Sequence, residues 1–522
     1  MKRQLILGPP GTGKTTTLLD IVDDCLRRGI RPDRIAYVSF TQKAAYEARD
    51  RAMERFNYTA DDFPYFRTLH SLSSRMQGLK HDDFMHKKHY EEIGRGLGIP
   101  GMTGKKLNAT TEFRNTNTGN HLLSMIDIAR NKKMTLSEYK DSIHEIALFY
   151  AMADHGKVLK QLVLEIEDYK NTYGLRDFTD LIVDPVRLEM PPLDIDVAII
   201  DEAQDLTAVQ WDFVNHIFCA VKEMYIAGDD DQAIYEWNGA DVDQFLRLEG
   251  ARRVLNKSYR LPRRPWLLAH TLANRITQRY EKEWSHNGTE GEVVKADSYK
   301  VAHILEGGEW MVLARNKAHL LTIQRWLVNK GVPIRFSDYN VIDPDHMAAI
   351  HGWVDLGAGK LISGLRAKQL YEVLMTQKHV GYGGKARMAD VQDDARLGYD
   401  DLRAEFALLA DITTPWWEVM ERIRPEKREY YRRCRQNGES LKNPRVTLST
   451  IHGVKGGEAD NVLLLPDMAR QTYKMFSLGR QYGNEEHRVF YVGASRAKKR
   501  LFICGQQAQH AYPFPKFKEK AA

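Results

Sequence analysis

Cysteine is scarce in this chain of 522 residues. Only four are present, and the closest two, Cys434 and Cys504, are 70 positions apart. No Cys-x-x-Cys pair exists, which excludes a zinc ribbon and a thioredoxin-type redox motif. Scattered thiols in a long chain are typical of a reducing compartment. We therefore expect a cytoplasmic protein, in a prokaryote or a virus-infected cell.

Long hydrophobic runs are also absent. No apolar run approaches the roughly 20 residues that a membrane helix needs. The N-terminus has three consecutive apolar residues, Leu5–Leu7, too few for a signal-peptide core. We expect no membrane contact. Charged residues make up 28% and apolar residues 43%, which excludes a disordered chain or a collagen-like repeat. The net charge of +6 permits a polyanionic partner without requiring one.

A glycine-rich loop follows directly after Leu5–Leu7, which has the pattern of a buried strand. Residues Gly8–Thr15 match G-x-x-x-x-G-K-[ST]. In this motif backbone amides wrap phosphate groups, Lys14 reaches the β- and γ-phosphates, and the Thr15 hydroxyl binds Mg²⁺. A helical pattern follows, so a helix N-terminus would face the anion. The expected nucleotide-binding residues of this loop are Gly8, Pro9, Pro10, Gly11, Thr12, Gly13, Lys14, Thr15 and Thr16.

A second motif, about 190 residues later, supplies carboxylates. Residues 196–200 have the pattern of a buried strand, and Asp201-Glu202-Ala203-Gln204-Asp205 follows. Carboxylates at the C-terminal end of a parallel strand lie beside the phosphate loop in open α/β sheets. Asp201 would bind Mg²⁺, and Glu202 would orient or deprotonate the attacking water. The two motifs predict hydrolysis of ATP or GTP and leave open what it drives.

Further segments occur in the order found in superfamily 1 helicases of the UvrD/Rep type, which the chain resembles. One of them, Gly228–Asp241, reads G-D-D-D-Q-A-I-Y-E-W-N-G-A-D and is a close match to the third motif of that family. The other matching segments lie at residues 37–45, 68–71, 177–181, 258–260, 446–458 and 485–497. With the phosphate loop, the resemblance extends from residue 8 to residue 497.

The resemblance implies an α/β fold. Two RecA-like P-loop NTPase domains, built on parallel sheets flanked by helices, would each carry a mainly helical insertion. We expect the first domain at residues 1–75 and 185–250 with its insertion at 76–184, the second domain at 251–345 and 441–507 with a short insertion at 346–440, and a tail at 508–522.

The resemblance also implies roles around the nucleotide. Arg260 and Arg496 would reach the γ-phosphate from the second domain, where an arginine finger can raise the rate roughly 10³–10⁵-fold. Closure of the two domains would then be needed for hydrolysis. The implied catalytic residues are Lys14, Glu202, Gln232 (a γ-phosphate sensor), Arg260 and Arg496. The remaining implied contacts are Tyr259 with the adenine, Glu458 with the ribose, and Gly456 beside it.

Single-stranded DNA is the implied partner. Tyr235 and Trp237 follow Gln232 closely, and in the family such aromatic residues stack on bases, each contributing roughly 1–3 kcal/mol. An isolated Tyr-x-Trp is more often core packing. The other expected DNA-binding residues are Phe40, Thr41, Lys43, His70 and His452.

Several positions depart from the family pattern. Only seven residues precede Gly8, so the glutamine segment that reads adenine is not found, and we expect weak discrimination among ATP, GTP and dATP. Leu69 replaces a frequent stacking phenylalanine and Asn238 a common arginine. Gly457 replaces a common leucine.

The leading hypothesis is an ATP-driven single-stranded DNA translocase and helicase, acting at single-strand/duplex junctions with the 3′→5′ polarity that the resemblance implies. Two alternatives stay open: an ATP-switched clamp or translocase that strips bound proteins without processive unwinding, and an RNA motor. The basic stretch at residues 422–435 could contact duplex phosphates. Interleaved glutamates make a solvated, ion-paired helix at least as good an interpretation.

Overall fold

The computed structural model describes residues 1–39, 42–105, 118–142, 146–337 and 341–516. Contacts divide the chain into two compact units. Unit 1 comprises residues 1–293, 468–500 and the chain from Ala508 onward, and unit 2 comprises residues 294–467 and 501–507. Among the described residues, no helix is both long and apolar enough to cross a membrane.

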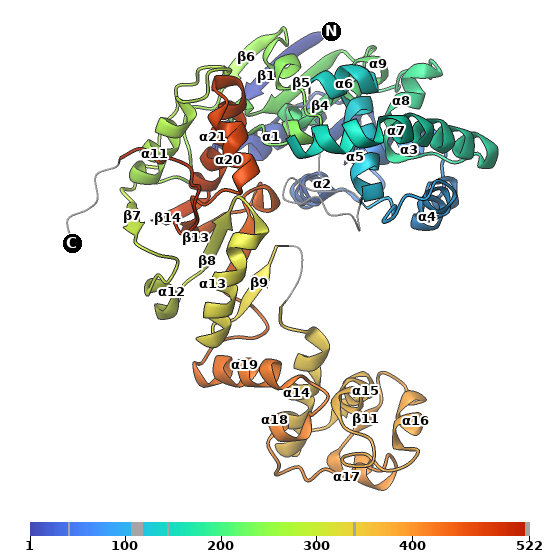
Figure 1. The fold of residues 1–522 in the computed structure, drawn as a ribbon, viewed down its shortest axis with the longest axis vertical. Coiled ribbons are helices and arrows are strands. Elements are labelled where there is room, and N and C mark those ends of the chain that lie inside the picture. The colour runs from blue at the N-terminus through green and yellow to red at the C-terminus, as the bar shows by residue number, and fades with distance from the viewer. Residues whose placement is uncertain (40–41, 106–117, 143–145, 338–340, 517–522) are drawn as a thin grey trace. The chain divides into compact units, whose positions relative to one another are not determined.

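Unit 1 is built on a six-stranded sheet of order β3-β2-β4-β5-β1-β6, in which all five neighbouring pairs are parallel (Figure 1). Successive side chains of a strand point to opposite faces. Ile6 accordingly packs in one apolar cluster, and Leu5 and Leu7 pack in another. The strands are β1 (Lys2–Leu7), β2 (Ile35–Ser39), β3 (Phe66–Thr68), β4 (Val197–Asp201), β5 (Glu223–Gly228) and β6 (Ala251–Val254).

Helices cover both faces of this sheet. One face packs against α1 (Lys14–Arg27) and α2 (Gln42–Phe56). The other packs against α3 (Leu69–Met76), α8 (Phe178–Arg187) and α9 (Ala208–Ile217). Leu69 is 2% exposed within this second cluster, so the residue that replaces the family's phenylalanine belongs to the core.

The first insertion is helical and has its own apolar core. Its helices are α4 (Lys87–Gly96), α5 (Thr118–Asn131), α6 (Leu136–Ser142) and α7 (Ile146–Tyr173). A buried ion network joins α5 and α7 to the first turn of α8. Arg130 donates to Asp177 at 2.6 Å, and Lys170 lies 3.1 Å from Asp177 and 2.9 Å from Asp180. The D-F-x-D-L element therefore holds the insertion to the sheet domain.

A second six-stranded sheet has the order β7-β14-β13-β8-β12-β9. Within it β8 pairs in parallel with β12 and β13, and β12 pairs in parallel with β9. The strands are β7 (Glu292–Ala296), β8 (Trp310–Ala314), β9 (Ile334–Phe336), β12 (Val446–Thr450), β13 (Ala459–Leu464) and β14 (Ala497–Cys504). Helices α12 (His303–Glu306) and α13 (Lys317–Asn329) contribute to its core.

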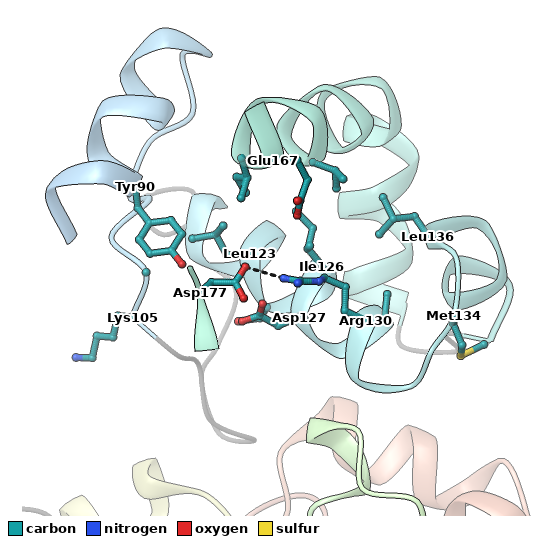
Figure 2. Close-up of a pocket in the computed structure, with 15 residues that line it drawn as sticks. Tyr90, Lys105, Leu123, Ile126, Asp127, Arg130, Met134, Leu136, Glu167 and Asp177 are labelled. Atoms are coloured by element: carbon teal, nitrogen blue, oxygen red, sulfur yellow. Dashed lines mark hydrogen bonds and ion pairs between the residues drawn. The ribbon is translucent and has the colours of Figure 1, made fainter. Parts of the chain in front are cut away.

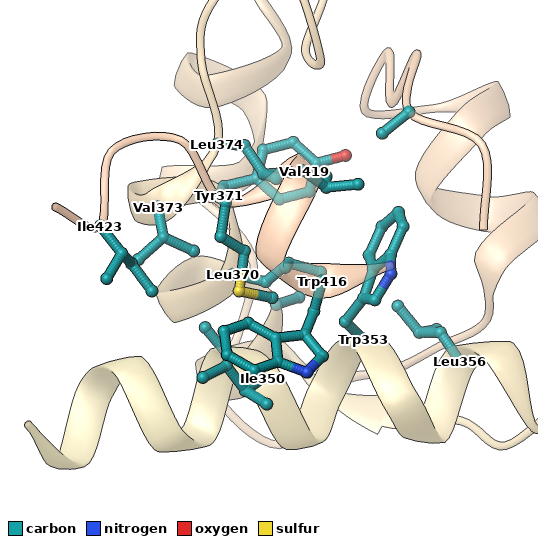
Figure 3. Packing of buried hydrophobic residues seen from close by; sticks show 14 of the residues in the cluster. Ile350, Trp353, Leu356, Leu370, Tyr371, Val373, Leu374, Trp416, Val419 and Ile423 are labelled. Carbon is teal, nitrogen blue, oxygen red and sulfur yellow. The ribbon is translucent and has the colours of Figure 1, made fainter. Parts of the chain in front are cut away.

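The second insertion is mainly helical, with a short antiparallel pair of β10 (Ile362–Ser363) and β11 (Arg396–Leu397). Trp353, Trp416 and Tyr371 converge in its apolar core (Figure 3). Its helices are α14 (Pro344–Gly357), α15 (Gly364–Val373), α16 (Gly384–Ala389), α17 (Tyr399–Ala404), α18 (Trp416–Val419) and α19 (Pro425–Gln436).

The remaining helices of unit 1 are α10 (Val242–Leu246), α11 (Arg263–Ala273), α20 (Arg470–Ser477) and α21 (Arg480–Ala494). The predicted fold class is confirmed, because two six-stranded sheets with parallel pairing are flanked by helices, as in two RecA-like domains. The residue bounds predicted for five separate parts stay a prediction.

Candidate nucleotide and DNA site

The phosphate loop joins β1 to α1. The amide of Gly8 donates to the carbonyl of Gly228 at 3.0 Å, which ties the loop to β5. The Thr12 hydroxyl closes the loop by donating to the Pro9 carbonyl at 2.7 Å. Gly11 and Gly13 have φ angles of +72° and +80°. These angles lie in the left-handed region that favours glycine, so the sequence allows the turn that exposes backbone amides.

Lys14 begins α1, and its ammonium group lies among carboxylates. Its Nζ is 3.2 Å from the carbonyl of Gly8 and 3.5 Å from Oε1 of Glu202. Burial alone would lower the pKa of Lys14, but the carboxylates of Glu202, Asp229 and Asp201 outweigh it and raise the pKa. Lys14 therefore stays protonated and positively charged at the end of the phosphate loop.

Asp201 ends β4 and has little exposed surface. Its carboxylate accepts hydrogen bonds from the Tyr37 hydroxyl at 2.8 Å and from the Glu202 amide at 2.9 Å. Burial and the neighbouring Glu202 raise the pKa of Asp201 to about 6, although Lys14 and Tyr37 act in the opposite direction. A divalent cation bound here would offset the repulsion between the Asp201 and Glu202 carboxylates. The hard oxygens of Asp201 and Thr15 are the kind that Mg²⁺ prefers, so these residues fit the ion.

Glu202 is held in a left-handed conformation with φ of 53°. Nε2 of Gln204 donates to the Glu202 carboxylate at 2.6 Å, and Oε1 of Gln204 accepts from the Asp229 amide at 3.0 Å. Gln204 therefore links the end of β4 to the end of β5. The sequence indicated no role for Gln204, whose function depends on this contact between strands.

The Ser258–Arg260 segment lies directly against the phosphate loop. The Ser258 hydroxyl donates to the Pro10 carbonyl at 2.8 Å, and the Tyr259 amide donates to the Gly11 carbonyl at 2.8 Å. A Cβ atom added at Gly11 would lie 2.3 Å from Cβ of Arg260, so the close approach needs glycine. The Tyr259 side chain is 72% exposed. Tyr259 and Arg260 are thus brought to the loop, as their predicted roles require.

Gln232 and Arg496 form a direct contact inside unit 1. A terminal nitrogen of the Arg496 guanidinium donates to Oε1 of Gln232 at 2.8 Å, and Nε2 of Gln232 donates to Asp229 at 2.8 Å. Arg496 is 1% exposed. The predicted sensor and one predicted arginine finger therefore lie together, next to an aspartate that also acts on Lys14.

Two cations missed by the sequence reasoning neutralise Asp229–Asp231. Lys282 Nζ lies 3.1 Å from Asp229, 2.5 Å from Asp230 and 3.0 Å from Asp231. Arg279 adds hydrogen bonds of 2.8 Å and 2.7 Å to Asp231. Three consecutive buried aspartates require cations, but no local pattern indicates which residues, about 50 positions away, supply them.

The aromatic segment follows Gln232 in unit 1. Tyr235 and Trp237 are half-buried, with ring centroids 6.3 Å apart and planes inclined by 57°. His70 is a half-buried residue in the first turn of α3, and its ring lies 6.1 Å from that of Phe178, which is 56% exposed. Phe178 is thus an exposed aromatic residue beside His70, and the predicted Asp-Phe-x-Asp element contained the signal.

The other predicted residues fall into two groups, those outside the described part of the chain and those in unit 2. Phe40 and Thr41 lie outside the described residues, as does the side chain of Lys43. His452, Gly456 and Glu458 belong to unit 2, where His452 is 8% exposed while Gly456 and Glu458 are exposed. Their roles stay predictions.

A cavity of about 220 Å³ lies in the first insertion and is not part of the phosphate loop. Figure 2 shows its charged side, where Arg130 contacts Asp177 near Tyr90 and Asp127. Separately, side-chain atoms of His81, Asp82 and His86 lie within 4.8 Å of one another. This group is largely exposed, and Nε2 of His86 is hydrogen-bonded to the His81 carbonyl at 2.9 Å.

Similar proteins point to the same chemistry. A probable DNA helicase II homolog of Rickettsia conorii is 22% identical, across 97% of this chain and 91% of its own length. A probable DNA helicase of Mycoplasma pneumoniae is 22% identical, across 62% of this chain and 61% of its own length. The ATP-dependent DNA helicase PcrA of Bacillus subtilis is 24% identical, across 54% of this chain and 39% of its own length. The chain thus spans less than two thirds of the latter two proteins.

Two family models match separate parts of the chain. The model of the UvrD/REP helicase N-terminal domain matches residues 1–252, and the model of the UvrD-like helicase C-terminal domain matches residues 433–507. Together these complementary domains cover well over half of the sequence. With the phosphate loop, the carboxylates of β4 and the Gln232–Arg496 contact in place, the chain belongs to the UvrD/Rep family of superfamily 1 helicases.

Proposed function

We propose that the protein is an ATP-dependent DNA helicase that moves along single-stranded DNA in the 3′→5′ direction and opens duplex at single-strand junctions, in the cytoplasm. The observation that best supports this is the continuity of one segment. Gln232, in contact with Arg496, is followed three and five residues later by Tyr235 and Trp237. Nucleotide state and base grip would therefore be governed by the same short stretch of chain.

The proposed hydrolysis depends on positioning and charge. Lys14, Arg260 and Arg496 would stabilise negative charge on the phosphates, which is the main contribution that a protein makes to phosphoryl transfer. Glu202 would orient the attacking water and accept its proton. Thr15 and Asp201 would hold Mg²⁺, which when bound neutralises charge on the β- and γ-phosphates.

The proposed DNA contact depends on the aromatic pair. Stacking of a base on an aromatic ring contributes roughly 1–3 kcal/mol without regard to sequence. Duplex stacking averages about 1.4 kcal/mol per step. Base pairs at the junction open by thermal fluctuation. A motor that advances along one strand by stacking on its bases can therefore prevent the opened pairs from re-forming.

The test combines steady-state ATP hydrolysis with strand release. We expect single-stranded DNA to stimulate hydrolysis more than RNA does, and a 3′-tailed duplex to be unwound while a 5′-tailed duplex is not. Unwinding only from 5′ tails would refute the polarity. Hydrolysis indifferent to polynucleotide would refute the motor. Removal of streptavidin from a biotinylated single strand, with no duplex release in a single turnover, would favour the protein-stripping alternative.

A further inference from the structure

Helix α21 contacts the nucleotide end of the segment from Asp229 to Trp237. The Tyr491 hydroxyl lies 3.5 Å from Oδ2 of Asp229. Arg496, just beyond the C-terminus of α21, donates to Gln232 at 2.8 Å and back to the Val492 carbonyl of the helix at 2.8 Å. The guanidinium that touches Gln232 is therefore fixed to the last turn of α21.

The same helix contacts the aromatic end of that segment through Arg488. The Arg488 side chain is 0% exposed, and its guanidinium forms an ion pair with Glu236. It also donates to the Gln278 carbonyl at 2.7 Å. Glu236 lies between Tyr235 and Trp237 and begins the short 3₁₀ turn η6 (Glu236–Asn238). The carboxylate that holds this turn to α21 is thus flanked on both sides by the proposed base-stacking residues.

A helix transmits displacement well because its backbone is hydrogen-bonded throughout. Arg488 and Tyr491 are three residues apart and so lie on the same face. The six positions from Arg488 to Ala494, the last residue of α21, correspond to roughly 9 Å along the helix axis. A fully buried arginine is costly unless it is paired, so separating Arg488 from Glu236 would be unfavourable when either end moves.

We propose that Arg488 and Glu236 are positioning residues that couple nucleotide state to base grip. A change in the Gln232–Arg496 contact would shift α21, and Arg488 would carry the shift to the turn that bears Tyr235 and Trp237. This inference rests on the proposed function, because it needs a nucleotide at one end and a base at the other. Neither residue touches the reacting atoms.

The experiment compares oligonucleotide dissociation constants without nucleotide and with a non-hydrolysable ATP analogue, by fluorescence anisotropy. Coupled sites typically differ in affinity about 5–150-fold between states. We expect Arg488→Met and Glu236→Gln to bring this ratio within about twofold of 1 and to lower DNA-stimulated hydrolysis at least fivefold. Hydrolysis without DNA should stay within twofold of the parent. Arg488→Lys keeps the charge and should restore part of the ratio.

Arg445→Met is the matched control. Arg445 pairs with Glu439 at 2.5 Å within unit 2 and is mostly buried, so its loss removes an ion pair of similar kind from the other unit. Arg445→Met should leave the ratio of the two oligonucleotide dissociation constants unchanged.

Three other outcomes would contradict a proposal. An unchanged ratio in Glu236→Gln would overturn the inference and leave the proposed function intact. Parallel loss of DNA-free hydrolysis and melting temperature in Glu236→Gln and Arg488→Lys would also overturn it, since the pair would then be structural. A parent protein that DNA does not stimulate would instead refute the proposed function.

Discussion

Glu202 and Asp196 stand at opposite ends of one strand and offer a matched pair of carboxylates. Glu202 directly follows β4 and lies 3.5 Å from Lys14, whereas Asp196 precedes β4 and pairs with Arg34 at 2.7 Å. We predict that Glu202→Gln lowers ATP hydrolysis at least a hundredfold, because an amide cannot accept a proton from water. Lys14 stays in place, so binding of a fluorescent ATP analogue should change by no more than a few-fold.

Asp196→Asn serves as the control for this prediction. It removes one negative charge next to the same strand, but at the end of β4 that lies away from the phosphate loop. Hydrolysis by Asp196→Asn should stay within about twofold of the parent. Equal losses in the two variants would mean that β4 is merely destabilised, and the role proposed for Glu202 would be wrong.

Trp237 tests the contact with bases. We predict that Trp237→Ala weakens binding of a single-stranded oligonucleotide by about 5–150-fold, the equivalent of roughly 1–3 kcal/mol for one lost stacking contact. Fluorescence anisotropy measures the affinity, and DNA-free hydrolysis should change far less. Trp326→Ala, at a partly buried tryptophan on the core of unit 2, is the comparison. Identical affinities for the two variants would place Trp237 outside the DNA site.

Local sequence is enough to propose a role for residues that belong to a short motif. Lys14, Asp201 and Gln232 belong to this class, since the backbone geometry of a phosphate loop or strand end positions them. Lys282, Arg279 and Arg488 could not be predicted in the same way. Their partners lie about 50 to 250 positions away, and a lone Lys or Arg in a helix or loop carries no signal of the buried carboxylate that it will meet.

Among the elements, the described part of the segment after β14 packs against α21. Tyr512 is 2% exposed and stacks on Phe490 of α21 with centroids 4.1 Å apart. The carbonyl of Pro513 accepts a hydrogen bond of 2.6 Å from Arg275 of the loop after α11. Aromatic side chains therefore attach the described part of the predicted tail to α21.

A pH-dependent stability follows from this packing. Nδ1 of His487 lies 2.6 Å from the Tyr512 hydroxyl, and burial, aided by Arg275, lowers the pKa of His487 to about 4. Below about pH 6.5 the unfolded chain binds a proton that the folded chain does not, so stability is present above pH 6.5 and is lost as the pH falls toward 4. After allowance for partial exposure, we predict a loss of about 1 kcal/mol between pH 7 and pH 5.

Denaturant unfolding at the two pH values measures this loss. His487→Phe keeps a ring against Phe476 and Tyr512 but cannot titrate. Between pH 7 and pH 5 its free energy of unfolding should therefore fall by about 1 kcal/mol less than that of the parent. His81→Gln, at an exposed histidine, should behave like the parent. A His487→Phe protein that loses as much stability as the parent would show that other groups cause the pH dependence.

At the scale of the whole molecule, motif order predicted the two parallel sheets well, because several motifs lie at the end of a strand, as the phosphate loop follows β1, the Asp201–Asp205 motif begins with the last residue of β4 and Asp229 follows β5. Which residues pack together in one compact unit is harder to predict from motif order. Residues 468–500 group with the phosphate-loop sheet in unit 1, since Arg488, Tyr491 and Arg496 all contact the segment after β5. Such contacts depend on tertiary packing that linear order does not encode.

The two units have separate apolar cores, which predicts two unfolding transitions in calorimetry. Trp353 is 3% exposed in the core of the second insertion, and its indole donates to the Thr414 carbonyl at 2.9 Å. Trp353→Ala should lower the free energy of unfolding by about 3–5 kcal/mol and lower the transition temperature of unit 2 by at least about 6 °C.

Trp211→Ala, at a fully buried tryptophan of unit 1, is the matched variant and should lower the other transition temperature and the affinity for nucleotide. Because a ligand stabilises the folded state that binds it, an ATP analogue should still raise the unit 1 transition in Trp353→Ala. If both variants lower one common transition equally, the cores unfold as a single cooperative body and the division into two units has no thermodynamic meaning.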